Sequence, residues 1–192
     1  MLKKKKEVII VVDLLNDFID GSLACLNGNN AVNESIKFIN DSLIPTIYIA
    51  DSHPNNHCSF KEYGGIWPSH CVKNSKGGEF HKDFYSLISF QEYKPNIHNT
   101  FYKGEDPKKE EYSGYYAKNS DGETLIDWLT KQEIDTLYIC GVATEYCIND
   151  TVNQLNNANF DIVIIEKALS YVDYQEHKKC IQSFIDKGIK LL

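Results

Sequence analysis

The chain has 192 residues, of which 42% are hydrophobic and 24% are charged, and its net charge is −7. These values are typical of a soluble globular protein, and the length predicts one domain over residues 1–192. The negative charge argues against a nucleic-acid partner. The apolar run 8–12 is too short for a signal peptide or a membrane span, so we expect a cytoplasmic protein without a membrane partner.

Strands and helices are predicted to alternate along the chain. Continuous apolar runs rich in Val and Ile, typical of parallel strands buried on both faces, lie at 7–13, 46–51, 135–141 and 160–166. Shorter strands are expected near 97–102 and 189–192. Apolar residues at helical spacing predict helices within 32–43, 125–129, 148–155 and 173–185, the last two capped by Thr144 and Asp173.

This alternation predicts an α/β fold. Helices would cover both faces of a central, mainly parallel sheet of about six strands, a three-layer α/β/α arrangement with right-handed crossovers. The segment 52–96 departs from the alternation, with few helical patterns and three of the five prolines. So long an irregular segment in a compact domain is usually functional.

The cysteines and the basic residues limit which structural sites and which substrates are expected. The six cysteines form no CxxC pair and follow no recognisable secretory signal, so we expect reduced thiols and no structural zinc ribbon. All 20 basic residues are lysine. Because arginine supplies the usual bidentate clamp for carboxylates and phosphates, its absence argues against a strongly anionic substrate.

The most informative segment is GVATEYC at 141–147, which lies between a predicted strand and a predicted helix. Cys147 is therefore expected in the first turn of a helix. There the helix dipole lowers a thiol pKa and favours the nucleophilic thiolate. The alternative is a buried structural cysteine, the commoner fate of this residue.

Two acidic residues end predicted strands, Asp13 the first and Asp51 the second. In an open α/β sheet ligands bind beyond the carboxyl ends of the strands, so we expect both near Cys147. Asp13 is either a turn residue or the general base that takes the thiol proton. A lysine would complete such a triad by stabilising the thiolate. Lys103 follows a short predicted strand, but nothing in the residues singles it out among 20 lysines.

A second group of polar residues suggests a metal site. Asp51 and His53 are two apart, so their side chains point the same way if strand geometry continues. With His70 they provide two imidazoles and one carboxylate, a common set for a divalent transition metal. The alternative is a polar loop of unrelated side chains. Glu62, in the same loop, is a further candidate ligand, directly or through water, whereas His177 is expected on a helix surface.

Seven short pieces of the sequence carry a family resemblance through their order and spacing. They are VVDLLNDF at 11–18, DSHPNNHCSF at 51–60, WPSHCV at 67–72, GGEFH at 77–81, YKG at 102–104, YSGYY at 112–116 and GVATEYCI at 141–148. In these pieces the chain resembles the nicotinamidase branch of the isochorismatase-like cysteine hydrolases, from about residue 7 to about residue 170. The DxH, WPxHCV and GVATEYC pieces distinguish this branch from metal-free relatives.

The resemblance implies a role for each matching catalytic position. Asp13 would be the base, Lys103 the charge stabiliser and Cys147 the nucleophile. The bond between Val142 and Ala143 would be a cis peptide. The backbone N–H groups of Ala143 and Cys147 would form the oxyanion hole.

The resemblance also implies the metal site and the substrate pocket. Asp51, His53 and His70 would hold the metal, with Glu62 at a position that is a ligand in some members. Zinc is the expected metal, and iron(II) and manganese(II) are the alternatives. Substrate-binding positions are matched by Phe18, Trp67, Tyr112 and Ala143.

The implied activity is hydrolysis of nicotinamide to nicotinate and ammonia through a thioester, in NAD salvage, with pyrazinamide as an analogue. The partner would be this small molecule, and a homo-oligomer remains open. A related cysteine hydrolase acting on another small amide or an enol ether is disfavoured by the metal set. A catalytically silent scaffold is disfavoured by the complete triad.

Leu15 and residues 73–76 depart from the family pattern and are expected to affect affinity or substrate range.

Overall fold

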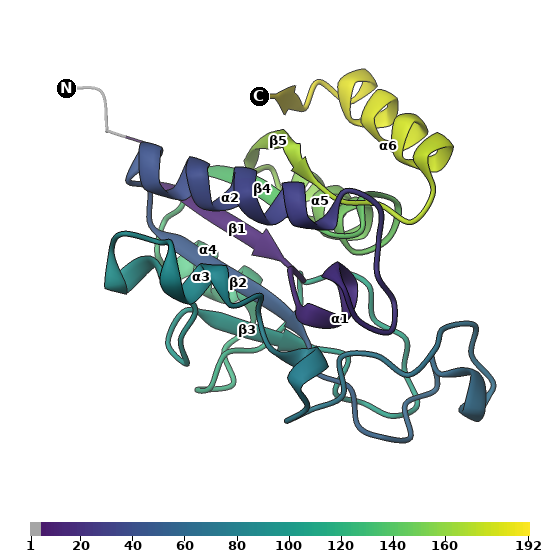
Figure 1. Ribbon diagram of the computed structural model, residues 1–192. Coiled ribbons are helices and arrows are strands. Elements are labelled where there is room, and N and C mark those ends of the chain that lie inside the picture. The colour runs from purple at the N-terminus through teal and green to yellow at the C-terminus, as the bar shows by residue number, and fades with distance from the viewer. Residues whose placement is uncertain (1–4) are drawn as a thin grey trace.

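The computed structural model describes residues 5–192. Within this range the chain forms one sheet of six parallel strands in the order β3-β2-β1-β4-β5-β6 (Figure 1). The strands are β1 (Glu7–Val12), β2 (Thr46–Asp51), β3 (Thr100–Lys103), β4 (Thr136–Gly141), β5 (Asp161–Leu169) and β6 (Lys190–Leu191). Each predicted strand is present, and the parallel sheet of the predicted α/β fold is confirmed.

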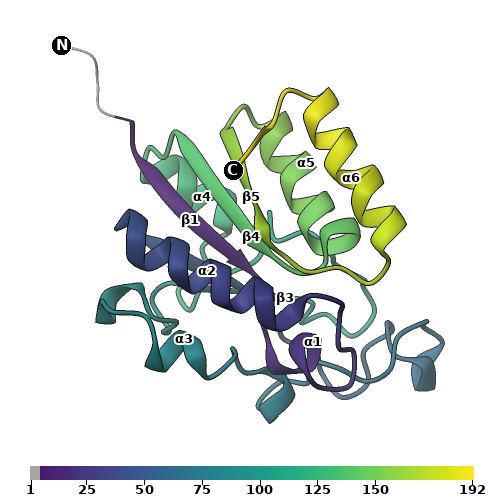
Figure 2. The ribbon, with the colours of Figure 1, turned by 45° about the horizontal axis from the view of Figure 1, so that its top comes forward.

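Helices cover both faces of this sheet, so the three-layer arrangement is confirmed (Figure 2). The helices of one layer are α1 (Asn16–Ile19), α2 (Gly28–Ser42) and α3 (Asp83–Ser86). Those of the other layer are α4 (Leu125–Lys131), α5 (Asn149–Asn157) and α6 (Tyr174–Asp186). Short helical turns are η1 (Lys61–Tyr63), η2 (Lys76–Gly78), η3 (Gln91–Tyr93) and η4 (Thr144–Ile148).

The central strand β1 contributes alternate side chains to two hydrophobic cores, as the period of two in a strand requires. Val8, Ile10 and Val12 pack into the core beneath α4, α5 and α6. Ile9 and Val11 pack into the core beneath α2. All five are at most 1% exposed, and burying an aliphatic side chain of this kind contributes about 1.5–3 kcal/mol. The strand that precedes Asp13 is therefore firmly held on both faces.

The order of the strands defines where a ligand can bind. β1 lies between β2 and β4, and the chain leaves β1 towards α2 on one face but leaves β4 towards α5 on the other. Such a switch point opens a crevice beyond the carboxyl ends of the two strands. Asp13 follows β1 at this crevice, and the segment 141–147 follows β4.

The irregular segment predicted at 52–96 is present and contains only η1, η2, α3 and η3 between β2 and β3. Its first part, blue in Figure 1, extends beyond the carboxyl ends of the strands. This position allows loop residues to close over the crevice. No helix in residues 5–192 is both long and apolar enough to cross a membrane.

One of the two predicted N-caps is confirmed and the other is wrong. The Asp173 side chain accepts hydrogen bonds from the N–H groups of Gln175 and Glu176 at the start of α6. Thr144 does not cap α5, because it is the first residue of the π-helical turn η4, which runs directly into that helix. Its hydroxyl lies instead 3.1 Å from the carbonyl oxygen of Ser170.

Candidate active site

The backbone around Cys147 has three unusual features in succession. Gly141 ends β4 with φ 131°, and a Cβ there would lie 2.0 Å from the carbonyl oxygen of Val12, so only glycine fits. The following bond between Val142 and Ala143 is a cis peptide. Cys147 then lies in the π-helical turn η4, a local geometry that is frequent at functional sites.

Cys147 lies beside a buried lysine and a buried aspartate. The Lys103 Nζ atom is 3.4 Å from the Cys147 Sγ atom and 2.9 Å from an Asp13 carboxylate oxygen. The three residues are between 0% and 5% exposed. Asp13 has φ 53°, in the left-handed region that Asp tolerates better than most residues. Its other carboxylate oxygen accepts a hydrogen bond from the Asp51 N–H at 2.9 Å.

The pKa shifts in this group follow from burial and from the single ammonium. Burial raises the pKa of Asp13 to about 6, against the opposing effect of Lys103. Burial lowers the pKa of Lys103, but the carboxylates of Asp13 and Asp51 outweigh it and hold that pKa well above its usual value. Burial would raise the pKa of Asp51, yet Lys103 and then His53 hold it below its usual value.

The expectation that the helix dipole lowers the pKa of Cys147 is wrong for the metal-free protein. Burial raises the pKa of this thiol well above its ordinary value, and Lys103 opposes the shift only in part, because Asp13 and Asp51 act against it. Desolvation by burial is the largest cause of this rise in pKa. The thiol is therefore protonated at rest, and a base must remove its proton before it can act as a nucleophile.

The predicted metal ligands lie together next to this group. Asp51, His53 and His70 place one ligand atom each within 4.8 Å of one another, and all three are at most 5% exposed. The Asp51 carboxylate is also in contact with the Lys103 ammonium. Asp51 thus joins the two groups, since it faces both the imidazoles and the lysine beside Cys147.

Backbone carbonyls orient both imidazoles. The Nδ1 atom of His53 is 2.9 Å from the carbonyl oxygen of Gly104, and that of His70 is 2.8 Å from the carbonyl oxygen of Pro68. A carbonyl only accepts, so each Nδ1 carries a proton, and in the neutral form of each imidazole the Nε2 atom keeps a lone pair for a cation. This donor set fits a divalent transition metal.

Gly104 has a role that the sequence reasoning missed. Its φ is +70°, and a Cβ at this position would lie 2.4 Å from the Cε1 atom and 2.6 Å from the Nδ1 atom of His53. Glycine therefore allows the backbone to approach His53 closely enough for the carbonyl contact. The signal available in the sequence was only that a glycine follows Lys103.

A small cleft reaches Cys147, and four of its lining residues are Phe, Trp or Tyr, so it is called the aromatic cleft below. Its lining residues are Phe18, Leu23, Cys25, Asp51, Trp67, His70, Glu110, Tyr112, Ala143, Tyr146, Cys147 and Val172. The Trp67 Nε1–H group donates a hydrogen bond to the Tyr112 hydroxyl at 3.1 Å. The predicted substrate-binding residues Phe18, Trp67, Tyr112 and Ala143 thus share one cleft. The sequence reasoning missed Tyr146, although it lies directly before Cys147 in the GVATEYC segment, and Glu110, which lies in no recognised motif.

Glu62 and His177, the two remaining residues with a predicted position, both lie outside the candidate metal group. Glu62 lies exposed in η1 and is not among the ligand atoms gathered around Asp51. The expectation that His177 lies on a helix surface is wrong, because the residue is only 9% exposed and its Nδ1 atom is 3.0 Å from the Thr144 hydroxyl. The reason is tertiary, since the first turn of α6 packs against η4.

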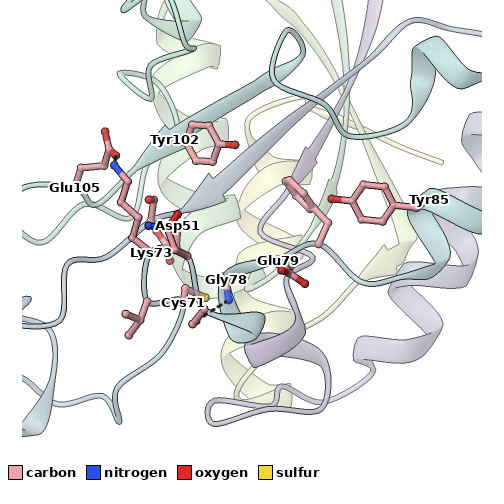
Figure 3. A pocket seen from close by; sticks show the side chains of 13 residues that line it. Asp51, Cys71, Lys73, Gly78, Glu79, Tyr85, Tyr102 and Glu105 are labelled. Atoms are coloured by element: carbon pink, nitrogen blue, oxygen red, sulfur yellow. Dashed lines mark hydrogen bonds and ion pairs between the residues drawn. The ribbon is translucent and has the colours of Figure 1, made fainter.

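A separate cavity of about 440 Å³ shares Asp51 with the aromatic cleft as a lining residue (Figure 3). Lys73, Asn74 and Ser75 line it, and an ion pair of 2.7 Å joins Lys73 to Glu105 at its wall. Cys147 is not among its lining residues. The family departure at 73–76 therefore changes the wall of this cavity rather than the aromatic cleft.

Comparison with known proteins identifies the family. A family model described as Isochorismatase domain matches residues 7–192. The chain belongs to the isochorismatase family. The nicotinamidase of Escherichia coli is 31% identical over 187 residues, which cover 87% of this chain and 84% of that protein.

Two solved structures are similar over nearly the whole chain. The pyrazinamidase of Pyrococcus horikoshii in complex with zinc has a TM-score of 0.81 at 31% identity, covering 97% of this chain and 98% of its own. The L. infantum protein PnC1 in complex with nicotinate has a TM-score of 0.80 at 27% identity, covering 98% of this chain and 92% of its own.

Proposed function

We propose that the protein is a nicotinamidase, a metal-dependent cysteine amidohydrolase that converts nicotinamide and water to nicotinate and ammonia. The observation that carries the proposal is the position of the Lys103 ammonium, 3.4 Å from Cys147 and 2.9 Å from Asp13. The same ammonium contacts Asp51 of the candidate metal group. The relatives described above support the substrate class, since they are a nicotinamidase, a pyrazinamidase and a protein in complex with nicotinate.

In the acylation half of the reaction, Asp13 removes the thiol proton of Cys147, and Lys103 stabilises the thiolate that forms. The thiolate attacks the amide carbon, and the carbonyl becomes an oxyanion. The C–N bond then breaks, and Asp13 returns the proton to the leaving nitrogen as ammonia departs. The raised pKa of Asp13, about 6, suits a group that both takes and returns a proton near neutral pH.

The second half of the reaction restores the enzyme. Asp13 takes a proton from a water molecule, which attacks the thioester carbon. The C–S bond breaks, Asp13 gives its proton to the Cys147 sulfur, and the nicotinic acid that leaves loses its carboxyl proton to solvent as nicotinate. Backbone N–H groups of Ala143 and Cys147 are proposed to bind the oxyanion of both steps. Removing one such donor typically costs about 3–4 kcal/mol of transition-state stabilisation.

Asp51, His53 and His70 are proposed to hold a divalent metal, with zinc the preferred ion and iron(II) or manganese(II) as alternatives. The fit rests on the two Nε2 lone pairs and the carboxylate at one buried point. When bound, the metal supplies a Lewis acid for a ring nitrogen of the substrate and thereby orients the ring. Phe18, Trp67 and Tyr112 are proposed to enclose that ring.

The test is ammonia release from nicotinamide, pyrazinamide and benzamide by the metal-loaded protein. Benzamide is the matched control, because it keeps the ring and the amide but lacks a ring nitrogen. The proposal predicts efficient hydrolysis of the first two and a much higher KM for benzamide. Equal KM values for nicotinamide and benzamide would contradict the metal-binding role. No release from any of them, with Cys147 still open to alkylation, would favour the alternative of another small amide.

A further inference from the structure

The turn that carries Cys147 is connected to the segment 170–177 by a set of buried polar contacts. Thr144, which begins η4, is fully buried. Its N–H group donates to the Ser170 carbonyl oxygen at 2.9 Å, and its hydroxyl lies 3.1 Å from the same oxygen. On its other side the hydroxyl is 3.0 Å from the Nδ1 atom of His177.

These contacts determine which group donates. A carbonyl oxygen only accepts, so the single hydroxyl proton of Thr144 points to Ser170. The hydroxyl oxygen then accepts from His177, and Nδ1 of that imidazole must carry a proton. The arrangement is a directed chain in which His177 donates to Thr144 and Thr144 donates to Ser170. The Thr144 hydroxyl can accept from His177 because its own proton is donated to Ser170.

The ring of His177 is itself held in place. It lies on the first turn of α6 with only 9% of its surface exposed. The Tyr171 ring packs against it with centroids 4.4 Å apart, and the Tyr174 ring lies on it at 6.2 Å. A second connection runs beside it, since the Glu145 carboxylate of η4 accepts from the N–H groups of Val172 and Asp173 at 2.8 and 2.7 Å.

We propose that His177 is a positioning residue for the nucleophile, which holds η4, and with it Cys147, against Lys103 and Asp13 through Thr144. Cys147 lies three residues after Thr144 in the same turn, whose last residue passes directly into α5. Lys103 comes from β3 at the other side of the crevice, so no local contact keeps its 3.4 Å distance to the thiol. A small shift of η4 would lengthen that distance and would move Tyr146, whereas Phe18 of α1 and His70, which also line the cleft, would keep their places.

The experiment replaces His177 by leucine and by asparagine. His177→Leu removes the donor, whereas the side-chain amide N–H of His177→Asn can occupy the place of Nδ1–H. For nicotinamide hydrolysis we expect the leucine variant to lose kcat by about 10- to 100-fold with little change in KM, as misplacing a catalytic group typically does. The asparagine variant should recover most of that loss. Thr144→Val should match His177→Leu, and the double variant should be no worse than either alone.

His98→Leu is the matched control, because His98 is exposed in a distant loop, and it should leave kcat unchanged. The proposal is overturned if His177→Leu keeps the wild-type kcat, if it changes KM alone, or if asparagine rescues nothing. If His177→Leu does not fold, judged by circular dichroism, the comparison of Thr144→Val with Thr144→Ser decides, with loss expected only in the valine variant.

The kinetic arm of this proposal rests on the proposed function, so a second readout separates the two. The rate at which iodoacetamide alkylates Cys147, followed by mass spectrometry, requires no substrate. His177→Leu should lower this rate and His177→Asn should restore it, because Lys103 no longer stabilises a displaced thiolate. That pattern in a protein that does not hydrolyse nicotinamide would reject the nicotinamidase proposal and keep the positioning role. An unchanged alkylation rate would overturn the positioning role.

Discussion

Gly104→Ala should weaken metal binding although position 104 contributes no metal ligand. A Cβ at this position would lie 2.4 Å from the Cε1 atom and 2.6 Å from the Nδ1 atom of His53, well inside van der Waals contact. His53 is 1% exposed, and its ring is packed against the His57 ring at 4.1 Å, so it has little room to move away. The ring must turn or the backbone must retreat, and either change lengthens the 2.9 Å contact between Nδ1 and the Gly104 carbonyl.

Two effects contribute to the expected magnitude. The φ of +70° at Gly104 costs an alanine about 1–2 kcal/mol of folding free energy, whatever surrounds it. Loss of the carbonyl that orients a metal-binding imidazole typically costs about 10- to 100-fold in metal affinity, or about 1.4–2.7 kcal/mol. Only the second effect should appear in metal binding.

Gly122→Ala separates the two effects. Gly122 has a similar φ, +79°, but a Cβ there would meet nothing within 4 Å. Both variants should therefore show the backbone cost of about 1–2 kcal/mol in urea unfolding of the metal-free proteins, and Gly104→Ala should lose more because its Cβ meets His53. Zinc affinity, measured by competition with a fluorescent chelator, should fall only in Gly104→Ala. Equal zinc affinity in the two variants would refute the reasoning about His53.

Two further predictions concern the buried charges. Lys103→Met in the metal-free protein should lower the unfolding free energy by about 3–5 kcal/mol near neutral pH, since it leaves Asp13 and Asp51 buried without a cation. In the folded variant the pKa values of both carboxyl groups should then exceed their unfolded values, so the loss of stability should grow as pH rises. An equal loss at acidic and alkaline pH would contradict this prediction. The control is Lys118→Met, at an exposed lysine. Because burial raises the pKa of Cys147, its alkylation rate in the metal-free protein should still increase above about pH 9, whereas a plateau below that pH would show a low thiol pKa.

The positions of Asp13 and Asp51 in the site could be predicted from the sequence, because they depend on local patterns. Asp13 and Asp51 each follow a continuous apolar strand, and the parallel sheet brings the carboxyl ends of such strands together. Lys103 could not be selected from the residues alone. Its place follows from the pairing of β2 with β3, in which Asp51 lies directly opposite Lys103, and pairing between strands is not a local property.

The expectations that failed depended on packing between distant segments. The helix dipole suggested a low pKa for Cys147, but burial and two neighbouring carboxylates act in the other direction. Thr144 is of a residue type that often caps helices, yet its hydroxyl donates a hydrogen bond to the carbonyl oxygen of Ser170 instead. His177 is buried because α6 begins against η4, a contact between distant segments that the sequence does not show.

The most direct test of the central claim is ammonia release from nicotinamide by the metal-loaded protein beside its Cys147→Ala variant. The contacts of Cys147 with Lys103, and of Lys103 with Asp13, predict that the wild type forms ammonia and nicotinate in equal amounts. They predict that the variant, with an unchanged circular dichroism spectrum and unchanged zinc affinity, forms neither. A folded Cys147→Ala protein that releases ammonia at the wild-type rate would contradict the claim that this thiol is the nucleophile.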